Sequence, residues 1–363
     1  MLLDVDALTR FAAIPAPTGA EAQRLDWLEH RLAPAPGVRG RDEVGNLIWN
    51  ERDGAPALLV MAHVDTVFDD VSAPEITRDA DDLVGPGIGD NAAAVIALVS
   101  VLESLGGLPP GVAIAFTVGE EGLGNLRGAR HACERLRPTW ALAVEGHGLD
   151  SVVTNHVGSV RARIEVNGPG GHSWWDRGIP SAIHALAELA APLARAGANI
   201  GAIAGGGAVN AIAAHADMLV ELRSLEQDDL TAFSSELEAL TVAEPLRLTH
   251  EIVGIRPAGR TPPEHALVQR ILAERRTLGL PERCESGSTD ANAAAALGIP
   301  AAAIGCGRGT GMHTTQERIS IPSLELGCRQ LAAVLPALTR AVGSEEPDLS
   351  LKPPIDAVGS VRP

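Results

Sequence analysis

Apolar residues along this chain gather in short continuous runs separated by segments with helical periodicity. Runs of strand length, bounded by polar or glycine residues, are found at 58–62, 113–118, 140–144 and 301–304. Segments typical of helices are found at 24–32, 92–105, 126–136, 264–277, 290–297 and 321–342. Strands alternating with helices predict an α/β domain with a mostly parallel sheet flanked by helices.

The pattern changes between residues 158 and 258. Residues 160–166 alternate polar and apolar positions, which is typical of a strand with one solvent-facing side. Further strands are predicted at 199–204, 209–212, 215–222 and 247–253, and helices at 181–195 and 228–240. The sequence therefore predicts a main domain formed by residues 1–157 and 259–345, an α+β sandwich inserted at 158–258, and a C-terminal tail at 346–363.

One helix start has its own signal. Thr18-Gly-Ala-Glu21 has the spacing of a capping box, in which the first and fourth side chains bond to each other's backbone amides. We expect it to begin the helix that continues to residue 32.

Composition limits the kinds of partner. The 363 residues exceed what one core usually holds, and only 2% are aromatic, with no tyrosine, so the core must be aliphatic. A net charge of −17 argues against nucleic acid or an anionic membrane as a partner. The four cysteines lack metal-site or disulfide spacing, which favours buried thiols in a reducing compartment. With no signal peptide pattern and no membrane-length apolar run, we expect a cytoplasmic location.

Chemically active side chains follow the predicted strands. The carboxyl ends of parallel strands meet at one edge of a sheet, so groups that follow different strands come together there. Taken singly, each has an ordinary explanation, such as a structural His-x-Asp pair, a solvated acidic turn or a helix cap. The residues that follow the strands or open the neighbouring loops are His63, Asp65, Asp90, Glu120, Glu121, Glu145 and His313.

Two histidines and three carboxylates can hold two divalent ions such as zinc. Neighbouring side chains diverge in a strand, so Glu120 and Glu121 cannot both face one metal ion. One of them can bind metal while the other accepts the proton of an attacking water. This division of roles is typical of a hydrolase.

The order of these motifs resembles one metallohydrolase family. Besides Ala62-His-Val-Asp-Thr66, the motifs are Gly-Ile-Gly-Asp90-Asn91, Gly-Glu-Glu-Gly122, Val-Glu145-Gly, Gly170-Gly-His172-Ser, Asn210-Ala-Ile, Leu222-Arg223-Ser, Gly287-Ser-Thr-Asp-Ala-Asn292 and His313-Thr-Thr-Gln-Glu317. The chain resembles the co-catalytic zinc exopeptidases and deacylases, which include acetylornithine deacetylase, succinyl-diaminopimelate desuccinylase, glutamate carboxypeptidase and peptidase T-like tripeptidases. The resemblance covers nearly the whole chain except the tail.

The resemblance implies roles for the main-domain residues. Two divalent ions, Zn²⁺ or else Co²⁺ or Mn²⁺, would bind to His63, Asp90, Glu121, Glu145 and His313. Asp90 would bridge them, and the peptide bond after it would be cis. Glu120 would be the general base, and Asp65 would orient His63.

The resemblance makes the inserted domain a lid and dimerisation domain. His172 would polarise the scissile carbonyl, from its own subunit or from the partner in a homodimer, and Asn210 and Arg223 would hold the substrate. Gly85-Pro-Gly87 and Glu221 depart from the common pattern, which leaves the substrate preference open. The expected activity is amide hydrolysis in di- or tripeptides; the alternatives are an N-acyl amino acid deacylase and a non-catalytic metal-dependent binding protein.

Overall fold

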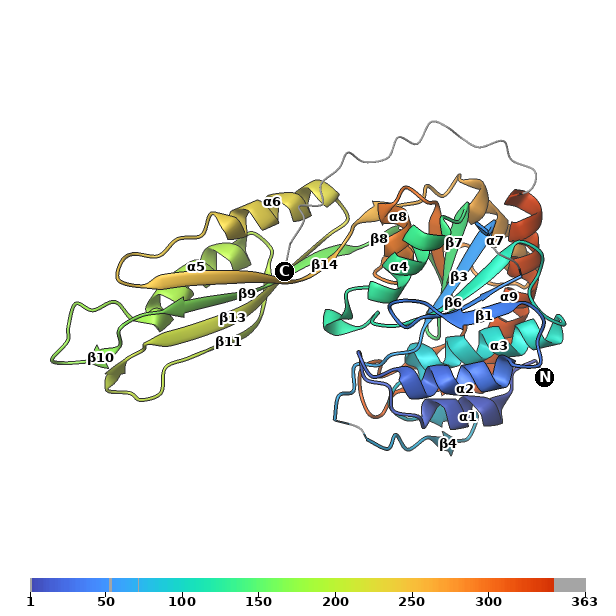
Figure 1. Cartoon of the computed structure of the whole chain (residues 1–363), viewed down its shortest axis with the longest axis horizontal. Helices are drawn as coiled ribbons and strands as arrows, with labels where there is room; N and C mark the ends of the chain where they lie inside the picture. Colours follow the sequence, from blue (N-terminus) through green and yellow to red (C-terminus); the bar gives the residue numbers. More distant parts are fainter. Residues whose placement is uncertain (1, 52–53, 71, 343–363) are drawn as a thin grey trace. The chain divides into compact units, whose positions relative to one another are not determined.

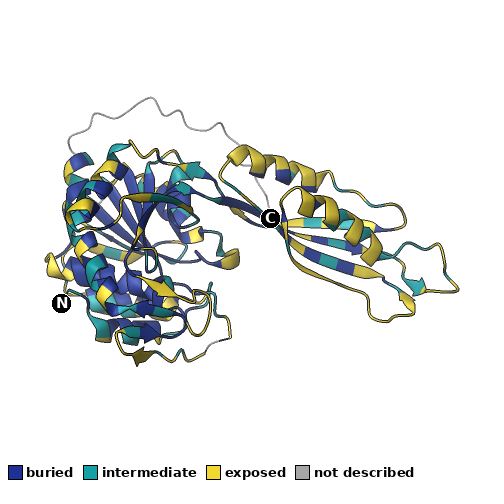
Figure 2. Cartoon of the chain, turned by 180° about the vertical axis from the view of Figure 1, so that it is seen from behind, coloured by how far each residue is buried: buried dark blue, intermediate teal, exposed yellow. Residues whose placement is uncertain are grey.

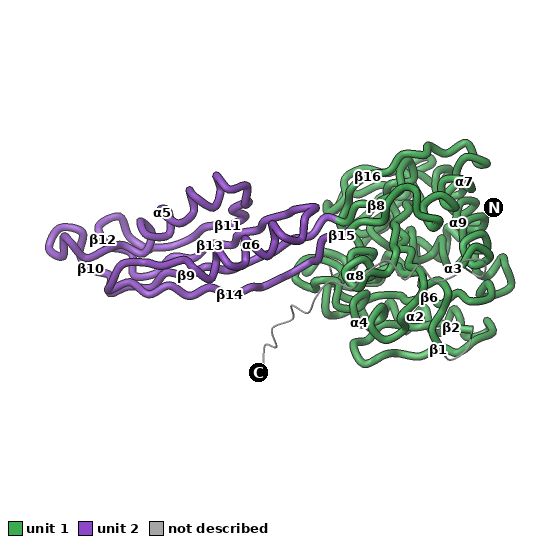
Figure 3. Tube along the Cα trace, turned by 90° about the horizontal axis from the view of Figure 1, so that it is seen from above, with its two compact units in different colours: residues 1–156, 260–363 green, residues 157–259 purple. Residues whose placement is uncertain are grey.

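The computed structural model describes residues 2–51, 54–70 and 72–342, so the predicted tail at 346–363 lies outside the described residues. The chain divides into two compact units (Figure 3). Unit 1 contains Met1–His156 and Arg260–Pro363, and unit 2 contains Val157–Gly259. Each is described by itself below.

Unit 1 is built on a central sheet whose middle strands are parallel (Figure 1). In spatial order its strands are β1 (Val38–Arg41), β2 (Leu47–Asn50), β6 (Val112–Thr117), β3 (Leu58–His63), β7 (Trp140–Glu145), β17 (Ala301–Gly305), β8 (Ser151–His156) and β15 (Gly259–Arg260), and β16 (Arg283–Gly287) also pairs with β8. Strands β6, β3, β7 and β17 run parallel, and β16 is parallel to β8. The pairs β1–β2, β2–β6 and β17–β8 are antiparallel.

Helices cover both faces of this sheet, and the strands between them are buried (Figure 2). One face packs against α1 (Val5–Ala12), α2 (Ala22–Leu32), α3 (Ala94–Ser104), α7 (Ala266–Thr277) and α9 (Ile321–Val342), and the other against α4 (Arg127–Leu136) and α8 (Ala291–Ala296). Alternation within β3 shows the division, because Leu58 and Val60 face the first layer while Leu59 and Met61 face the second. The predicted α/β fold with a mostly parallel, helix-flanked sheet is confirmed.

A second sheet of unit 1 holds two loops together. It consists of β18 (Gly309–Thr310), β19 (Arg318–Ser320), β5 (Asp82–Val84) and β4 (Thr77–Asp79), in that order and antiparallel. Arg318 reinforces it, with guanidinium nitrogens 2.9 Å from Asp79 and 3.0 Å from Asp82. The loops that leave β5 and enter β19 are therefore fixed beside each other.

Unit 2 has its own core and its own antiparallel sheet. The strand order is β11 (Asn199–Gly205), β13 (His215–Ser224), β9 (Gly158–Asn167) and β14 (Arg247–Arg256). Alternate residues of β9, from Val160 to Val166, are buried with residues of α5 (Ala182–Arg195) and α6 (Gln227–Glu238). A short pair, β10 (Gly171–His172) and β12 (Ala211–Ile212), continues beyond the sheet.

Three of the cysteines are buried and all four are free thiols. In the described part of the chain, no helix combines the length and hydropathy that crossing a membrane requires.

Candidate active site

The carboxyl edge of the parallel strands collects the predicted metal ligands. His63 and Glu145 are the last residues of β3 and β7, and Glu121 lies in the turn that follows β6. Asp90 and His313 lie in the two loops that the small sheet holds together. These five residues come from five separate segments of unit 1.

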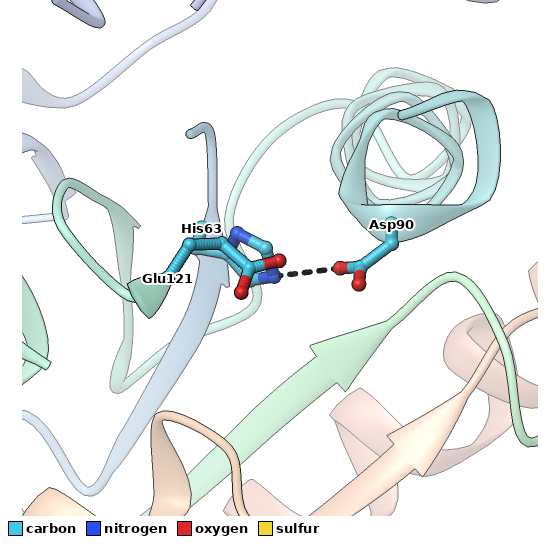
Figure 4. Close-up of side chains that lie close together, drawn as sticks. All are labelled: His63, Asp90 and Glu121. Atoms are coloured by element: carbon cyan, nitrogen blue, oxygen red, sulfur yellow. Dashed lines mark ion pairs between the residues drawn. The ribbon is translucent and has the colours of Figure 1, made fainter. Parts of the chain in front are cut away.

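Asp90 lies at the centre of the cluster. Its Oδ1 is 3.1 Å from His63 Nε2, and its Oδ2 is 3.1 Å from His313 Nε2. His63 Nε2 is also 3.6 Å from Glu145 Oε2, and His313 Nε2 is 3.4 Å from Glu121 Oε1. One ligand atom each from His63, Asp90 and Glu121 lie within 4.8 Å of one another (Figure 4). The Asp90 carboxylate thus has one oxygen directed to each histidine, which is the arrangement that bridging requires.

Asp65 supports the turn after β6 and also lies beside the ring of His63. Its carboxylate accepts hydrogen bonds from the backbone amides of Glu120 and Glu121, both at 3.0 Å, and from Thr18 Oγ1 at 2.8 Å. The carboxylate is 3.5 Å from His63 Nδ1, whereas the carbonyl oxygen of Asp65 is 3.2 Å away. The buried Asp65 carboxylate therefore fixes the backbone positions of Glu120 and Glu121.

The predicted capping box is wrong. Helix α2 begins at Ala22, and neither Thr18 nor Glu21 caps it through its side chain. Glu21 Oε1 instead accepts from the amides of Gly19 and Gly119, at 2.8 and 3.1 Å. Both side chains instead support the turn that carries Glu120, whose amides need acceptors away from water. Glu21 accepts from the amide of Gly119, and Thr18 donates to Asp65, which accepts from the amides of Glu120 and Glu121.

Asn91 joins the Asp90 loop to the end of β7. Its Nδ2 donates to the carbonyl of Val144 at 2.9 Å, and its Oδ1 accepts from the amide of Gly146 at 2.8 Å. These bonds lie on either side of Glu145 in the chain. The peptide bond between Asp90 and Asn91 is cis, as the resemblance implied. The sequence pattern predicts no role for Asn91, and its only signal is its place directly after Asp90.

The carboxylates of the cluster favour the protonated forms of its two histidines. Burial alone would lower the pKa of His63, but bonds to Asp65, Asp90 and Glu145 raise it well above its ordinary value. The carboxylates of Asp90 and Glu121 raise the pKa of His313 to about 10. A metal ion that binds these imidazoles must displace their protons.

The pKa values of the carboxyl groups in the cluster are shifted in opposite directions. Burial raises the pKa of Glu121 to about 7 and also raises the pKa of Glu145. Burial alone would raise the pKa of Asp90 as well, but the imidazoles of His313 and His63 hold it far below its usual range. Several acidic groups are buried close to one another, and bound cations would compensate their negative charge. A site of this kind favours divalent ions.

A cavity of about 540 Å³ opens beside Glu121. Its lining includes Thr18, Gly122, Leu123 and Arg127. The volume falls within the range typical of small-molecule sites, roughly 300–1,000 Å³. Unit 1 therefore offers room for a small substrate next to a predicted metal ligand.

The three remaining predicted site residues lie in unit 2. His172 Nδ1 accepts hydrogen bonds from the amides of Trp174 and Trp175, at 3.2 and 3.4 Å. A neutral imidazole with Nδ1 as acceptor carries its proton on Nε2, so this ring presents an N–H donor to solvent. Asn210 is adjacent, because its carbonyl accepts from Ser173 and the next residue, Ala211, pairs with His172.

Arg223 lies near the opposite end of β13 from these two residues. It pairs with Ser159, whereas the first residue of the strand, His215, pairs with Asn167. Its Nε is 3.0 Å from Glu221, which also contacts Arg161 Nε at 2.8 Å. Unit 2 therefore brings His172 and Asn210 together but not Arg223.

The comparisons agree with one another. Residues 59–337 match the family described as Peptidase family M20/M25/M40. The chain is 25% identical to the LysW-lysine hydrolase of Deinococcus radiodurans, over 93% of this chain and 97% of that protein. It is 26% identical to the succinyl-diaminopimelate desuccinylase of Stenotrophomonas maltophilia, over 78% of this chain and 84% of that protein.

Solved structures show the same fold. The aminopeptidase PepT from Bacillus cereus is similar with a TM-score of 0.75 and 21% identity, over 93% of this chain and 100% of that chain. The metallo-carboxypeptidase Sso-CP2 from Sulfolobus solfataricus has a TM-score of 0.76 and 14% identity, over 93% and 99% of the two chains.

Proposed function

The chain belongs to peptidase family M20/M25/M40, whose members are metal-dependent hydrolases, and from that premise we propose that it hydrolyses an amide bond in short peptides. The proposal rests mainly on the Asp90 carboxylate, whose two oxygens each lie 3.1 Å from a different histidine. Glu120 is the general base, and the substrate is a di- or tripeptide with a free carboxylate.

The donor set fits two divalent ions. Imidazole nitrogens and carboxylate oxygens suit zinc, and five such side chains suffice for two ions that share Asp90. One ion would be held by His63 and Glu145 and the other by Glu121 and His313. When bound, the ions would lower the pKa of water toward about 7 and polarise the amide carbonyl.

Glu120 is placed to accept and return a proton. It is buried, it precedes the predicted ligand Glu121 in the chain, and its charge acts on His63, Glu121 and Glu145. Its amide is held by Asp65, which fixes the start of the side chain. A carboxylate in this position takes the proton of the attacking water and delivers it to the leaving amine.

His172 supplies a donor to the developing oxyanion. The bonds from Trp174 and Trp175 keep its proton on Nε2. A donor that is already oriented needs no reorganisation when negative charge forms on the carbonyl oxygen. We therefore expect the loss of His172 to lower the turnover rate more than it weakens substrate binding.

Amino acid deacylation is the second candidate. It is favoured by the two relatives matched over most of the chain, which are called a LysW-lysine hydrolase and a succinyl-diaminopimelate desuccinylase. The peptidase proposal is supported by the likeness of Gly287-Ser-Thr-Asp-Ala-Asn292 to the tripeptidase motif. Both reactions need the same ions and the same base.

A pooled substrate assay tests the proposal and separates the candidates. Zinc- or cobalt-loaded protein is incubated with di- and tripeptides and with N-acetyl and N-succinyl amino acids, and the mixture is followed by mass spectrometry. We expect peptides to disappear. Loss of acyl compounds alone would transfer the assignment to the deacylases, and loss of neither by fully metallated protein would contradict amide hydrolysis of this substrate class.

The matched control is Glu120→Gln, which removes the base but no predicted ligand. We expect metal content to be retained and hydrolysis to fall by a factor on the order of 10² to 10⁴. Wild-type turnover in this variant would show that Glu120 is not the base.

A further inference from the structure

A buried carboxylate lies behind the metal-ligand cluster. Glu317 has an exposed fraction of 0%. Its Oε1 accepts hydrogen bonds from the backbone amide of Asp90 at 3.0 Å and from His147 Nε2 at 2.6 Å. Burying an ionisable group is costly unless it is paired, so this contact is built into the fold.

The contacts of Glu317 connect three ligand-bearing segments. Glu317 follows His313 by four residues, and His147 follows Glu145 by two. The third contact is the amide of Asp90 itself. One carboxylate oxygen therefore links the loops that carry three of the five predicted ligands.

Two neighbouring glycines, Gly89 and Gly309, provide the space in which His147 and Glu317 meet. A Cβ at Gly89 would collide with His147 Nε2 and with Glu317 Oε1, and a Cβ at Gly309 would collide with the His147 ring. The amide of Gly85 also donates to the carbonyl oxygen of Glu317, at 2.8 Å. Two glycines thus permit close approach of the two side chains to the Asp90 loop.

We infer that Glu317 and His147 are positioning residues that hold the Asp90, Glu145 and His313 loops at the spacing required for metal binding. Neither side chain needs to touch metal or substrate. Asp90 is gripped on both sides, because Glu317 holds its amide while Asn91 is bonded to Val144 and Gly146. The inference concerns metal binding and holds whichever substrate is cleaved.

Long-range charge supports the same arrangement. Among the described residues, no donor lies within hydrogen-bonding distance of Glu317 Oε2, so His147 and Asp90 provide the side chain's contacts. The buried guanidinium of Arg24 also interacts electrostatically with Glu317. Burial lowers the pKa of Arg24 to about 10, and the negative charges of Asp65 and Glu317 act in the opposite direction. Loss of the His147 donor leaves the Glu317 carboxylate with one hydrogen bond fewer. It also removes the contact that ties the loop after Glu145 to Glu317.

The test is Co²⁺ binding to the full chain, read as affinity and as the visible absorption spectrum of bound cobalt. We expect His147→Ala to weaken Co²⁺ binding about 10- to 100-fold, as is typical when a partner behind a metal ligand is lost, and to alter the spectrum. His147→Gln keeps an N–H donor and should recover part of both. The control is His131→Ala, because His131 forms a comparable 2.8 Å contact with Glu43 on the surface; its affinity should stay within about twofold.

A purely structural role predicts a different result. It would lower the melting temperature of the metal-free protein while leaving the Co²⁺ affinity and spectrum unchanged, and that outcome would overturn the inference. Should His147→Ala fail to fold, Glu317→Gln and His147→Gln decide the matter by the same readouts. Wild-type protein that binds Co²⁺ but hydrolyses nothing would contradict the proposed function and leave this inference standing.

Discussion

Asp290 carries a buried carboxyl group that is hydrogen-bonded to the last residue of β6. The side chain is 1% exposed, Thr117 Oγ1 lies 2.5 Å from its Oδ2, and its Oδ1 has no hydrogen-bond partner among the described residues. Burial, reinforced by the charge of Glu120, raises the pKa of Asp290 to about 8. The group is therefore mostly protonated at pH 7 and adds little to the negative charge that acts on Glu120, the predicted general base.

This pKa predicts how stability changes with pH. A carboxyl whose pKa is higher in the folded state contributes stability that is fully present below the unfolded value, about 3.9, and is lost as pH rises through about 8. Asn cannot ionise, so Asp290→Asn should be spared that loss. We expect its free energy of unfolding, relative to wild type, to be at least about 1 kcal/mol more favourable at pH 9 than at pH 6. Urea unfolding of metal-free protein measures this, and an equal difference at both pH values would contradict it.

At the scale of single residues, the sequence predicted which ligands come together but not what holds them. His63, Asp90, Glu121, Glu145 and His313 follow strands or open loops, so topology alone indicated their meeting. Thr18 and Glu21 were assigned to a helix cap because spacing reports only local partners, whereas their side chains bond to Asp65 and the turn at Gly119. Metal binding by the five predicted ligands stays a prediction, and so do the roles of Asp65, Glu120, His172, Asn210 and Arg223.

At the scale of elements, β13 separates two sets of predicted substrate contacts. His172 and Asn210 lie beyond its His215 end, and Arg223 lies eight residues along from His215. Eight residues of extended strand span roughly 26 Å. A dipeptide reaches only about 7 Å. We therefore expect that one small substrate does not contact both sets in a single copy of the chain.

Two copies can supply what one cannot, and this predicts complementation. Protein with His172→Ala and protein with Arg223→Ala should each be inactive, and subunit exchange between them should restore activity. Random pairing gives about half mixed dimers with one intact site each, so we expect about a quarter of wild-type activity. Gel filtration establishes whether dimers are present. Mixed dimers without recovered activity would show that the two sets do not serve one substrate.

Sequence patterns found the continuous apolar strands of the central sheet and also the mostly exposed β11 of unit 2, but they missed β8 and β16. Strands β3, β6, β7 and β17 are apolar because helices cover both faces, and α9 was predicted with the bounds it has. Strand β16, with the sequence RCESG and little burial, has no apolar period, and its pairing with β8 depends on a distant segment. Hydrophobic periodicity reports burial, so elements that stay partly exposed carry little of that signal.

At the scale of the molecule, the chain enters unit 2 through β9 and leaves it through the neighbouring strand β14. Ser159 of β9 pairs with Arg256 of β14, and in unit 1 the amide of Thr261 donates to the carbonyl of Thr154 at 2.9 Å. A short glycine linker can therefore replace residues 157–259. We expect the shortened protein to retain Co²⁺ binding and to lose hydrolysis, since His172, Asn210 and Arg223 are removed. Full activity of the shortened protein would show that unit 2 is dispensable for catalysis.

The position of β17 in the central sheet has a consequence for synthesis. It lies between β7 and β8, although it is made some 150 residues after them. The nascent chain thus emerges with an apolar strand edge at β7 that nothing yet covers, while the contiguous unit 2 can fold as soon as it leaves the ribosome. We expect the first half of the chain to depend on chaperones until residue 305 has been added. The reason is that β17, which places the His313 segment near Glu145, is also the strand that completes the central sheet.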